Sequence, residues 1–203
     1  MDVLSEGANI IGAINTIVRN KNVLKGYNTN AIGIMDALSH KGFDPEDKSV
    51  LVFGTGGSAR AVVFILNWLR TRTIYVTGRN EEKTRNIVRD FGGEAVTFDS
   101  LPKRPLPVNM VINATSVSSV DESQEMADLV EKLDVPASEL VMDLNYDRDR
   151  NFWEEMAKNR GIHFMDGLFP LAYQARRTFA LWMGLQVPPE EFLKALEPQT
   201  GNS

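Results

Sequence analysis

A run of glycines between two apolar segments, VLVFGTGGSARAVVFIL at residues 50–66, is the feature that most constrains the fold. The first segment is short and rich in valine, which is typical of a buried strand, and the second is long enough for a helix. Gly54, Gly56 and Ala59 fit the pattern G-x-G-x-x-G/A. In that pattern the first glycine permits a tight turn, the second lets the backbone approach a pyrophosphate, and the third position stays small where helix meets strand. The turn predicts dinucleotide binding, with a purely structural glycine turn as the alternative.

The chain after this turn repeats the alternation of strand and helix. Apolar segments predict six strands, at 49–54, 73–78, 94–98, 109–114, 139–144 and 162–166. Near-continuous apolar strands separated by amphipathic helices are typical of a parallel sheet covered on both faces. We therefore expect an α/β fold with a Rossmann-like doubly wound parallel sheet, six strands in the order 3-2-1-4-5-6. The link at 99–108 holds three prolines and no clear helix, and it would cross to the other side of the first strand.

The first 30 residues follow a different pattern, with two short strands around the turn RNKN at 19–22. An isolated hairpin is marginal in water, so we interpret residues 1–30 as the hairpin remnant of a substrate-binding domain. We predict a nucleotide-binding domain at 31–184, which begins with a helix at 31–42 and ends with a returning helix. The remaining residues, 185–203, predict a further helix and a frayed tail.

Composition excludes several classes of partner. The formal net charge of -5 argues against general nucleic-acid binding, which needs a basic surplus. No apolar run reaches the roughly 20 residues of a membrane span. Cysteine is absent, and His40 and His163 have no second ligand at metal spacing. The sequence thus predicts a cytoplasmic chain without a metal, a membrane or a nucleic-acid partner.

The end of the second predicted strand favours NADP over NAD. NAD sites usually carry a carboxylate there, which accepts a hydrogen bond from the ribose 2′-hydroxyl, whereas this chain has Arg79. A guanidinium cannot accept, but its fork of donors suits a 2′-phosphate. Asn80 and Lys83 add donors and positive charge nearby. In the alternative interpretation this segment is a solvated helix start, where Glu81 and Glu82 complement the helix dipole.

Several motifs, in this order and spacing, resemble the C-terminal two-thirds of the shikimate dehydrogenase family: AINTIV, GYNTNAIG, GTGGSARA, INATS, MDLNY and GLFPLAYQARRTFALWMG. The resemblance implies an NADP(H)-dependent oxidoreductase that reduces 3-dehydroshikimate to shikimate, with a shikimate-like small molecule as substrate. It implies substrate contacts from Asn15, Tyr146 and Gln174. The predicted cofactor-binding residues are Gly54, Gly56, Gly57, Ser58, Ala59, Arg79, Asn80, Lys83, Asn113, Thr115 and Gly167.

Two departures from the family pattern bear on catalysis. The family's proton-handling pair is a lysine, whose segment would lie upstream of residue 1, and an aspartate, whose position holds Asn30. An amide can orient a hydroxyl through hydrogen bonds, but it does not titrate. General acid–base catalysis contributes about 10² to 10⁴ in rate, so this chain alone is predicted to be impaired or inactive.

Other conspicuous residues are interpreted as structural. Asp143 ends a predicted strand on the cofactor side, and in the family pattern it is a fixed polar residue beside a loop, so we assign it no proton transfer. Trp68, Trp153, Phe179 and Trp182 have positions suited to helix–sheet packing and are predicted to anchor a core or an interface.

Three functions stay open from the sequence alone. The chain is a shikimate dehydrogenase-like oxidoreductase, a non-catalytic NADP(H)-binding module, or a structural remnant that dimerises through its hairpin. Retention of Asn15, Tyr146 and Gln174 favours the first, although each also has a plain structural explanation; Asn30 favours the second. Through residues 1–29 the chain would pair with a second copy or with a missing lobe. The substrate remains open among shikimate, quinate and related polyols.

Overall fold

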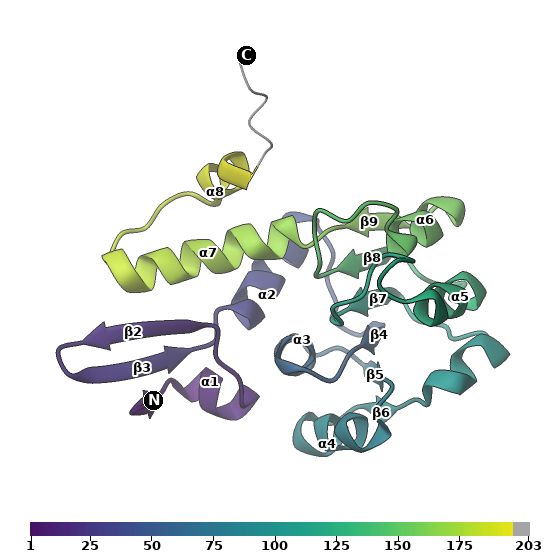
Figure 1. Cartoon of the computed structure of the whole chain (residues 1–203), viewed down its shortest axis with the longest axis horizontal. Helices are drawn as coiled ribbons and strands as arrows, with labels where there is room; N and C mark the ends of the chain where they lie inside the picture. Colours follow the sequence, from purple (N-terminus) through teal and green to yellow (C-terminus); the bar gives the residue numbers. More distant parts are fainter. Residues whose placement is uncertain (197–203) are drawn as a thin grey trace, which may run out of the picture.

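A six-stranded, all-parallel sheet forms the centre of the larger part of the molecule (Figure 1). The computed structural model describes residues 1–196. The spatial order of the strands is β6-β5-β4-β7-β8-β9, which is 3-2-1-4-5-6 in chain order and confirms the predicted doubly wound topology. The strands are β4 (Ser49–Phe53), β5 (Thr73–Thr77), β6 (Glu94–Ala95), β7 (Met110–Asn113), β8 (Leu140–Asp143) and β9 (His163–Met165).

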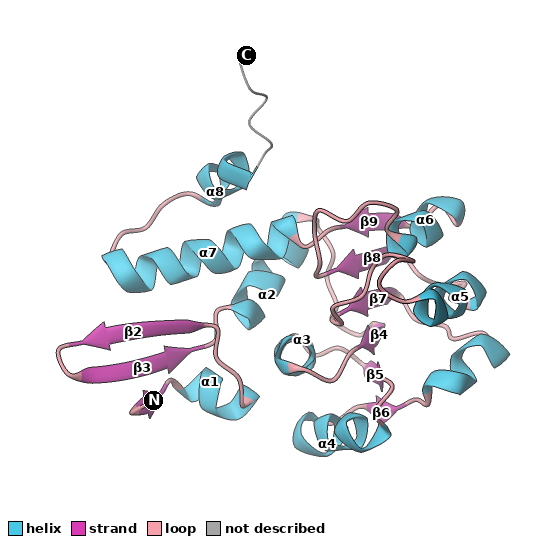
Figure 2. Ribbon diagram, viewed as in Figure 1, coloured by secondary structure: helices cyan, strands magenta, loops and turns pink. Residues whose placement is uncertain are grey.

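Helices cover both faces of this sheet (Figure 2). The central strand β4 is buried along its whole length, and its side chains alternate between two hydrophobic clusters. Val50 and Val52 pack with residues of α2, α3 and α7, whereas Leu51 and Phe53 pack with residues of α5 and α6. These helices are α2 (Asn30–His40), α3 (Gly57–Trp68), α4 (Glu81–Phe91), α5 (Gln124–Lys132), α6 (Phe152–Asn159) and α7 (Leu168–Met183); the last helix, α8 (Pro189–Leu196), packs against α7 instead.

The N-terminal residues form a second, smaller sheet of three strands in the order β1-β3-β2. Strands β2 (Thr16–Asn20) and β3 (Val23–Tyr27) make the predicted antiparallel hairpin. Two elements before the hairpin were not predicted: strand β1 (Val3–Leu4), which pairs in parallel with β3, and helix α1 (Glu6–Ile11). Ser5 caps α1 by accepting a hydrogen bond from the N–H of Ala8. The hairpin is therefore part of a small sheet rather than isolated.

Side chains on α3 and α7 donate hydrogen bonds to backbone carbonyls of this N-terminal region. Arg60, on α3, donates from Nε to the carbonyl of Ile11 at 2.5 Å and forms an ion pair with Asp90 at 3.0 Å. Trp182, near the end of α7, donates from its indole N–H to the carbonyl of Ile17 in β2 at 3.0 Å. The first contact fixes the end of α1, and the second fixes the hairpin.

Two expectations about the segment after β5 were wrong. The third strand, predicted at 94–98, is only Glu94–Ala95, and residues Phe98–Lys103 form a 3-10 helix in a link where no helix was expected. After Val96, whose N–H still donates to the carbonyl of Val76 in β5, the chain leaves the sheet, and Leu101 of the 3-10 helix packs into the core. Of the predicted core or interface anchors, Trp153 is fully buried in the core, whereas Trp68 and Trp182 are 67% and 60% exposed, so for these two only the interface role stays a prediction.

The predicted frayed tail, 197–203, lies outside the described residues. Within the part of the chain that the structure describes, no helix has both the length and the apolar character to cross a bilayer.

Candidate functional site

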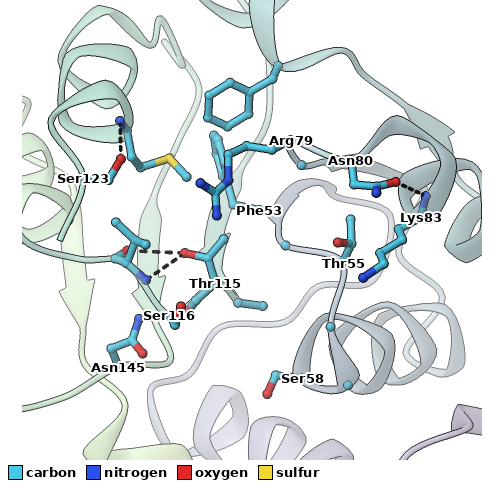
Figure 3. Close-up of a pocket in the computed structure, with 18 of the residues that line it drawn as sticks. Phe53, Thr55, Ser58, Arg79, Asn80, Lys83, Thr115, Ser116, Ser123 and Asn145 are labelled. Atoms are coloured by element: carbon cyan, nitrogen blue, oxygen red, sulfur yellow. Dashed lines mark hydrogen bonds between the residues drawn. The ribbon is translucent and has the colours of Figure 1, made fainter.

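A cleft of about 570 Å³ opens at the carboxyl ends of β4, β5 and β7, where the strand order reverses (Figure 3). Ligands bind open α/β sheets at this crevice. Its walls come from the glycine turn at 54–58, the segment 78–80 after β5, the segment 114–117 after β7, and the first turn of α5. The cleft therefore has the position of a dinucleotide site.

The glycine turn supplies a bare backbone to the floor of this cleft. Gly54 has φ +123°, and a Cβ there would lie 2.6 Å from the carbonyl oxygen of Ala114. Gly56 precedes α3, and a Cβ there would meet no atom within 4 Å, so the space in front of it is open. Among the described residues no side chain caps the start of α3, which leaves its first N–H groups available to a ligand. These groups and the helix dipole suit a diphosphate.

Arg79 and Lys83 project into the cleft from the side of β5 and α4 (Figure 3). Asn80 also lines the cleft; its Oδ1 accepts the N–H of Lys83 at 2.9 Å and caps α4, so its Nδ2 is the atom that faces a ligand as a donor. Glu125 also lines the cleft, yet within residues 1–196 no ion pair involves Arg79. The cleft thus holds a guanidinium whose donors are available to an anion.

Three of the predicted cofactor residues lie elsewhere. Ala59 and Asn113 are fully buried and do not line the cleft. Asn113 instead accepts the N–H and hydroxyl of Thr115, at 3.0 and 2.7 Å, from behind the wall. Gly167 lines a neighbouring cavity of about 140 Å³, which shares Ser58 with the cleft.

The predicted substrate residues gather around this smaller cavity. Asn30, Tyr146 and Gln174 line it, and Asn15 joins two of them. The Nδ2 of Asn15 lies 2.7 Å from Oδ1 of Asn30 and 3.0 Å from Oε1 of Gln174. Among the described residues that line the cavity, Tyr146 carries the only ionisable side chain. This set can therefore bind hydroxyls through amides but offers no carboxylate or ammonium group for proton transfer.

Behind these amides lies a cluster of hydroxyls that the sequence analysis missed. Thr16, Thr29 and Thr178 place their Oγ1 atoms 2.8 to 3.4 Å apart. The N–H of Thr29 also donates to Oδ1 of Asn15 at 2.8 Å, which fixes the orientation of that amide. All three threonines stand inside motifs noted in the sequence, AINTIV, GYNTNAIG and GLFPLAYQARRTFALWMG, but no pattern pointed to their hydroxyls.

Asp166, just before α7, directly precedes Gly167, which lines this cavity. Burial raises its pKa above the usual range for aspartate; the N–H of Leu168 and the charge of Lys41 oppose the shift, and the charge of Asp143 adds to it. A raised pKa means that the folded state binds the proton more tightly than the unfolded state. Asp166 therefore costs stability increasingly as the pH rises above the pKa of the unfolded chain, about 4.

We expect Asp166→Asn to raise Tm by a few degrees at pH 7, because the amide keeps an oxygen for the N–H of Leu168 and carries no charge. The gain should shrink as the pH falls below about 4, where both states of the wild type are protonated. Thermal unfolding monitored by circular dichroism at several pH values measures this. Asp149→Asn, at an exposed carboxylate, is the control and should change nothing. A gain that is independent of pH would contradict the explanation.

Together, the doubly wound sheet, the bare glycine turn at its switch point and the available guanidinium define an α/β protein of the dinucleotide-binding class. Comparisons with known proteins narrow this class. The family model described as Shikimate / quinate 5-dehydrogenase matches residues 37–166. The chain belongs to the shikimate dehydrogenase family.

Individual relatives agree with this assignment. The protein named shikimate dehydrogenase (NADP(+)) from Desulforamulus reducens is 36% identical over 208 residues, which cover 98% of this chain and 71% of the relative. The shikimate 5-dehydrogenase of Thermus thermophilus, solved in complex with NADP(H) and shikimate, superposes with a TM-score of 0.81 at 30% identity and covers 96% of this chain. The Aquifex aeolicus shikimate dehydrogenase superposes with a TM-score of 0.82 at 27% identity and covers 97% of this chain. This chain spans about 71% of the length of each of these relatives.

Proposed function

We propose that this chain is the NADP(H)-binding part of a shikimate dehydrogenase-type oxidoreductase, whose complete site interconverts 3-dehydroshikimate and shikimate. One observation carries the proposal: Arg79, which makes no ion pair within the described residues, presents its guanidinium to the cleft that the glycine turn opens. The Thermus thermophilus relative, solved with NADP(H) and shikimate, supports both ligands. When bound, the cofactor supplies or accepts a hydride.

Different residues of the cleft hold different parts of the cofactor. The N–H groups at the start of α3 hold the diphosphate, because Gly56 leaves room for it. Arg79 and Lys83 hold the 2′-phosphate of NADP(H), because a guanidinium and an ammonium both donate hydrogen bonds to a phosphate. The 2′-hydroxyl of NAD(H) carries no negative charge for them to bind. Thr115 and Asn145 form the wall on the side of β7 and β8.

The smaller cavity holds the ring substrate. Asn30 and Gln174 hydrogen-bond ring hydroxyls, Asn15 orients both amides, and Tyr146 closes the opposite side. The amides of Asn15, Asn30 and Gln174 do not titrate, so they cannot deliver a proton to an alkoxide. We therefore infer that the chain by itself turns over little or no substrate. Shikimate and quinate both carry ring hydroxyls that these amides can bind.

A second candidate is a non-catalytic NADP(H)-binding module. The absence of any ionisable side chain other than Tyr146 among the described residues of the smaller cavity favours it. In both cases residues 1–30 belong to a substrate-binding domain and 31–184 to the NADP-binding domain. Exposed apolar side chains in the small sheet, Leu4 and Ile17 among them, support pairing through residues 1–29 with a second copy or with a further lobe.

Calorimetric titration with NADPH and NADH, followed by an assay of shikimate and quinate oxidation, tests the proposal. We expect NADPH to bind at least about tenfold more tightly than NADH, because a charged hydrogen bond to the 2′-phosphate contributes about 1.5–3 kcal/mol. We expect no measurable turnover, with the Desulforamulus reducens enzyme as the positive control. Equal affinity for the two cofactors would show that Arg79 does not select the 2′-phosphate. Turnover close to that of the control would show that another group moves the proton.

A further inference from the structure

A buried carboxylate lies behind the wall of the cleft, on the side of β7 and β8. Asp143, the last residue of β8, is fully buried and accepts four hydrogen bonds. Its Oδ1 accepts from Nδ2 of Asn113 at 2.8 Å and from the N–H and Nδ2 of Asn145 at 3.0 and 3.1 Å. Its Oδ2 accepts from Nδ2 of Asn151 at 2.7 Å. One acceptor-only group therefore receives an amide NH₂ from each of three asparagines.

This arrangement fixes which end of each amide faces the wall. With its NH₂ turned to Asp143, Asn113 presents its oxygen to the N–H and hydroxyl of Thr115. Asn145, held in the same way, donates to the carbonyl of Thr115 at 2.9 Å and to the hydroxyl of Ser118 at 2.8 Å. If either amide turned over, two oxygens would face each other in a buried place. The carboxylate therefore determines the hydrogen bonds that hold the segment 115–118.

The segment held in this way belongs to one half of the cleft. In a doubly wound sheet the two mononucleotide halves bind on either side of the point where the strand order reverses. Arg79 and Lys83 come from the side of β5, whereas Thr115 and Asn145 come from β7 and β8. A change at Asp143 should therefore disturb ligand binding in the half of the cleft beside β7 and β8. It should leave binding unchanged in the half that holds the 2′-phosphate.

We propose that Asp143 is a positioning residue that shapes the nicotinamide half of the cofactor cleft through Asn113 and Asn145. The inference rests on the proposed function, because it presupposes that NADP(H) occupies the cleft. Asp143 itself does not touch the ligand, since it is fully buried and does not line the cleft. Its effect is the placement of Thr115 and Asn145, which do line it.

The test compares two ligands on Asp143→Asn. The amide has nearly the size of the carboxylate, but one of its two ends now donates, so at least one neighbouring asparagine loses its acceptor. We expect the Kd for NADPH to rise at least about tenfold, measured by calorimetry. The Kd for adenosine 2′,5′-bisphosphate, which lacks the nicotinamide half, should stay within about twofold. Asp121→Asn, at a carboxylate 76% exposed and paired with Arg150, is the matched control and should change neither value.

A second variant keeps the test decisive if Asp143→Asn does not fold. Asn113→Ala removes the acceptor of Thr115 from a buried position that does not line the cleft, and the same difference between the two ligands is expected. If the variants bind NADPH as tightly as the wild type, or lose affinity for both ligands equally, the positioning role is overturned while the proposed function stands. A wild type that binds neither ligand overturns the proposed function and this inference together.

Discussion

Replacing Arg79 with alanine is expected to weaken NADPH binding about 50-fold and to leave NADH binding almost unchanged. A charge-assisted hydrogen bond contributes about 1.5–3 kcal/mol, which corresponds to roughly 10- to 150-fold in affinity. The guanidinium makes no ion pair among the described residues, so its removal strands no buried partner. The loss should therefore come from the 2′-phosphate alone. Isothermal titration with both cofactors measures it.

Arg85→Ala is the matched control for this change. Arg85 is also a cationic residue near the start of α4, but its side chain forms an ion pair with Glu81 at 3.0 Å and does not line the cleft. It should leave the affinity for NADPH within about twofold, since an exposed pair of this kind contributes little. A loss of NADH binding in Arg79→Ala equal to the loss of NADPH binding would show that Arg79 acts on the whole dinucleotide and does not select the phosphate.

Replacing Gly54 with alanine is expected to destabilise the fold by about 3 kcal/mol or more. Its φ of +123° is a conformation that residues with a side chain rarely adopt, and strained backbone of this kind costs about 1–3 kcal/mol. The added Cβ would also lie 2.6 Å from the carbonyl oxygen of Ala114, a backbone atom of the neighbouring strand end. Urea unfolding followed by circular dichroism measures the loss of stability.

Gly56→Ala makes the complementary change two residues later. Here φ is -88°, an ordinary value, and the new Cβ would meet no atom within 4 Å. The free energy of unfolding should stay within about 1 kcal/mol of the wild type, since the backbone is compatible with alanine. The affinity for NADPH should fall at least about tenfold, because the methyl group occupies the space that a diphosphate must enter. Intact NADPH binding in Gly56→Ala would contradict the placement of the diphosphate.

Much of the larger sheet could be predicted because the signal for each strand is local. Segments such as 49–54 and 109–114 are short, apolar and bounded by polar or helix-forming stretches, and both faces of a parallel sheet are buried. Strand β6 could not be delimited in this way. Val96 has the character of a strand residue and still donates its N–H to Val76 of β5, but the chain then turns into the 3-10 helix that brings Leu101 to the core, a long-range contact that no local pattern announces.

The candidate site, too, could be predicted only where the signal in the sequence is local. The glycine turn and Arg79 follow from short-range patterns, since a strand, a turn and a helix place them in one crevice. The contact of Asn15 with Gln174 joins residues 159 positions apart, so the expectation for these two came from family motifs and not from periodicity. Thr178 stayed unnoticed because a hydroxyl on a helix is unremarkable until folding brings two further hydroxyls beside it.

The indole of Trp182 has a practical consequence. Strand β2 lies at the edge of the small sheet, and this indole covers its Ile17 carbonyl while remaining 60% exposed. Any β-strand that extends the small sheet at that carbonyl must first push the ring aside. In a Trp68→Phe background the fluorescence comes from Trp182 and from Trp153, which is fully buried and should give a constant signal. A shift on assembly would then report on Trp182, so the chain carries its own optical reporter for a partner.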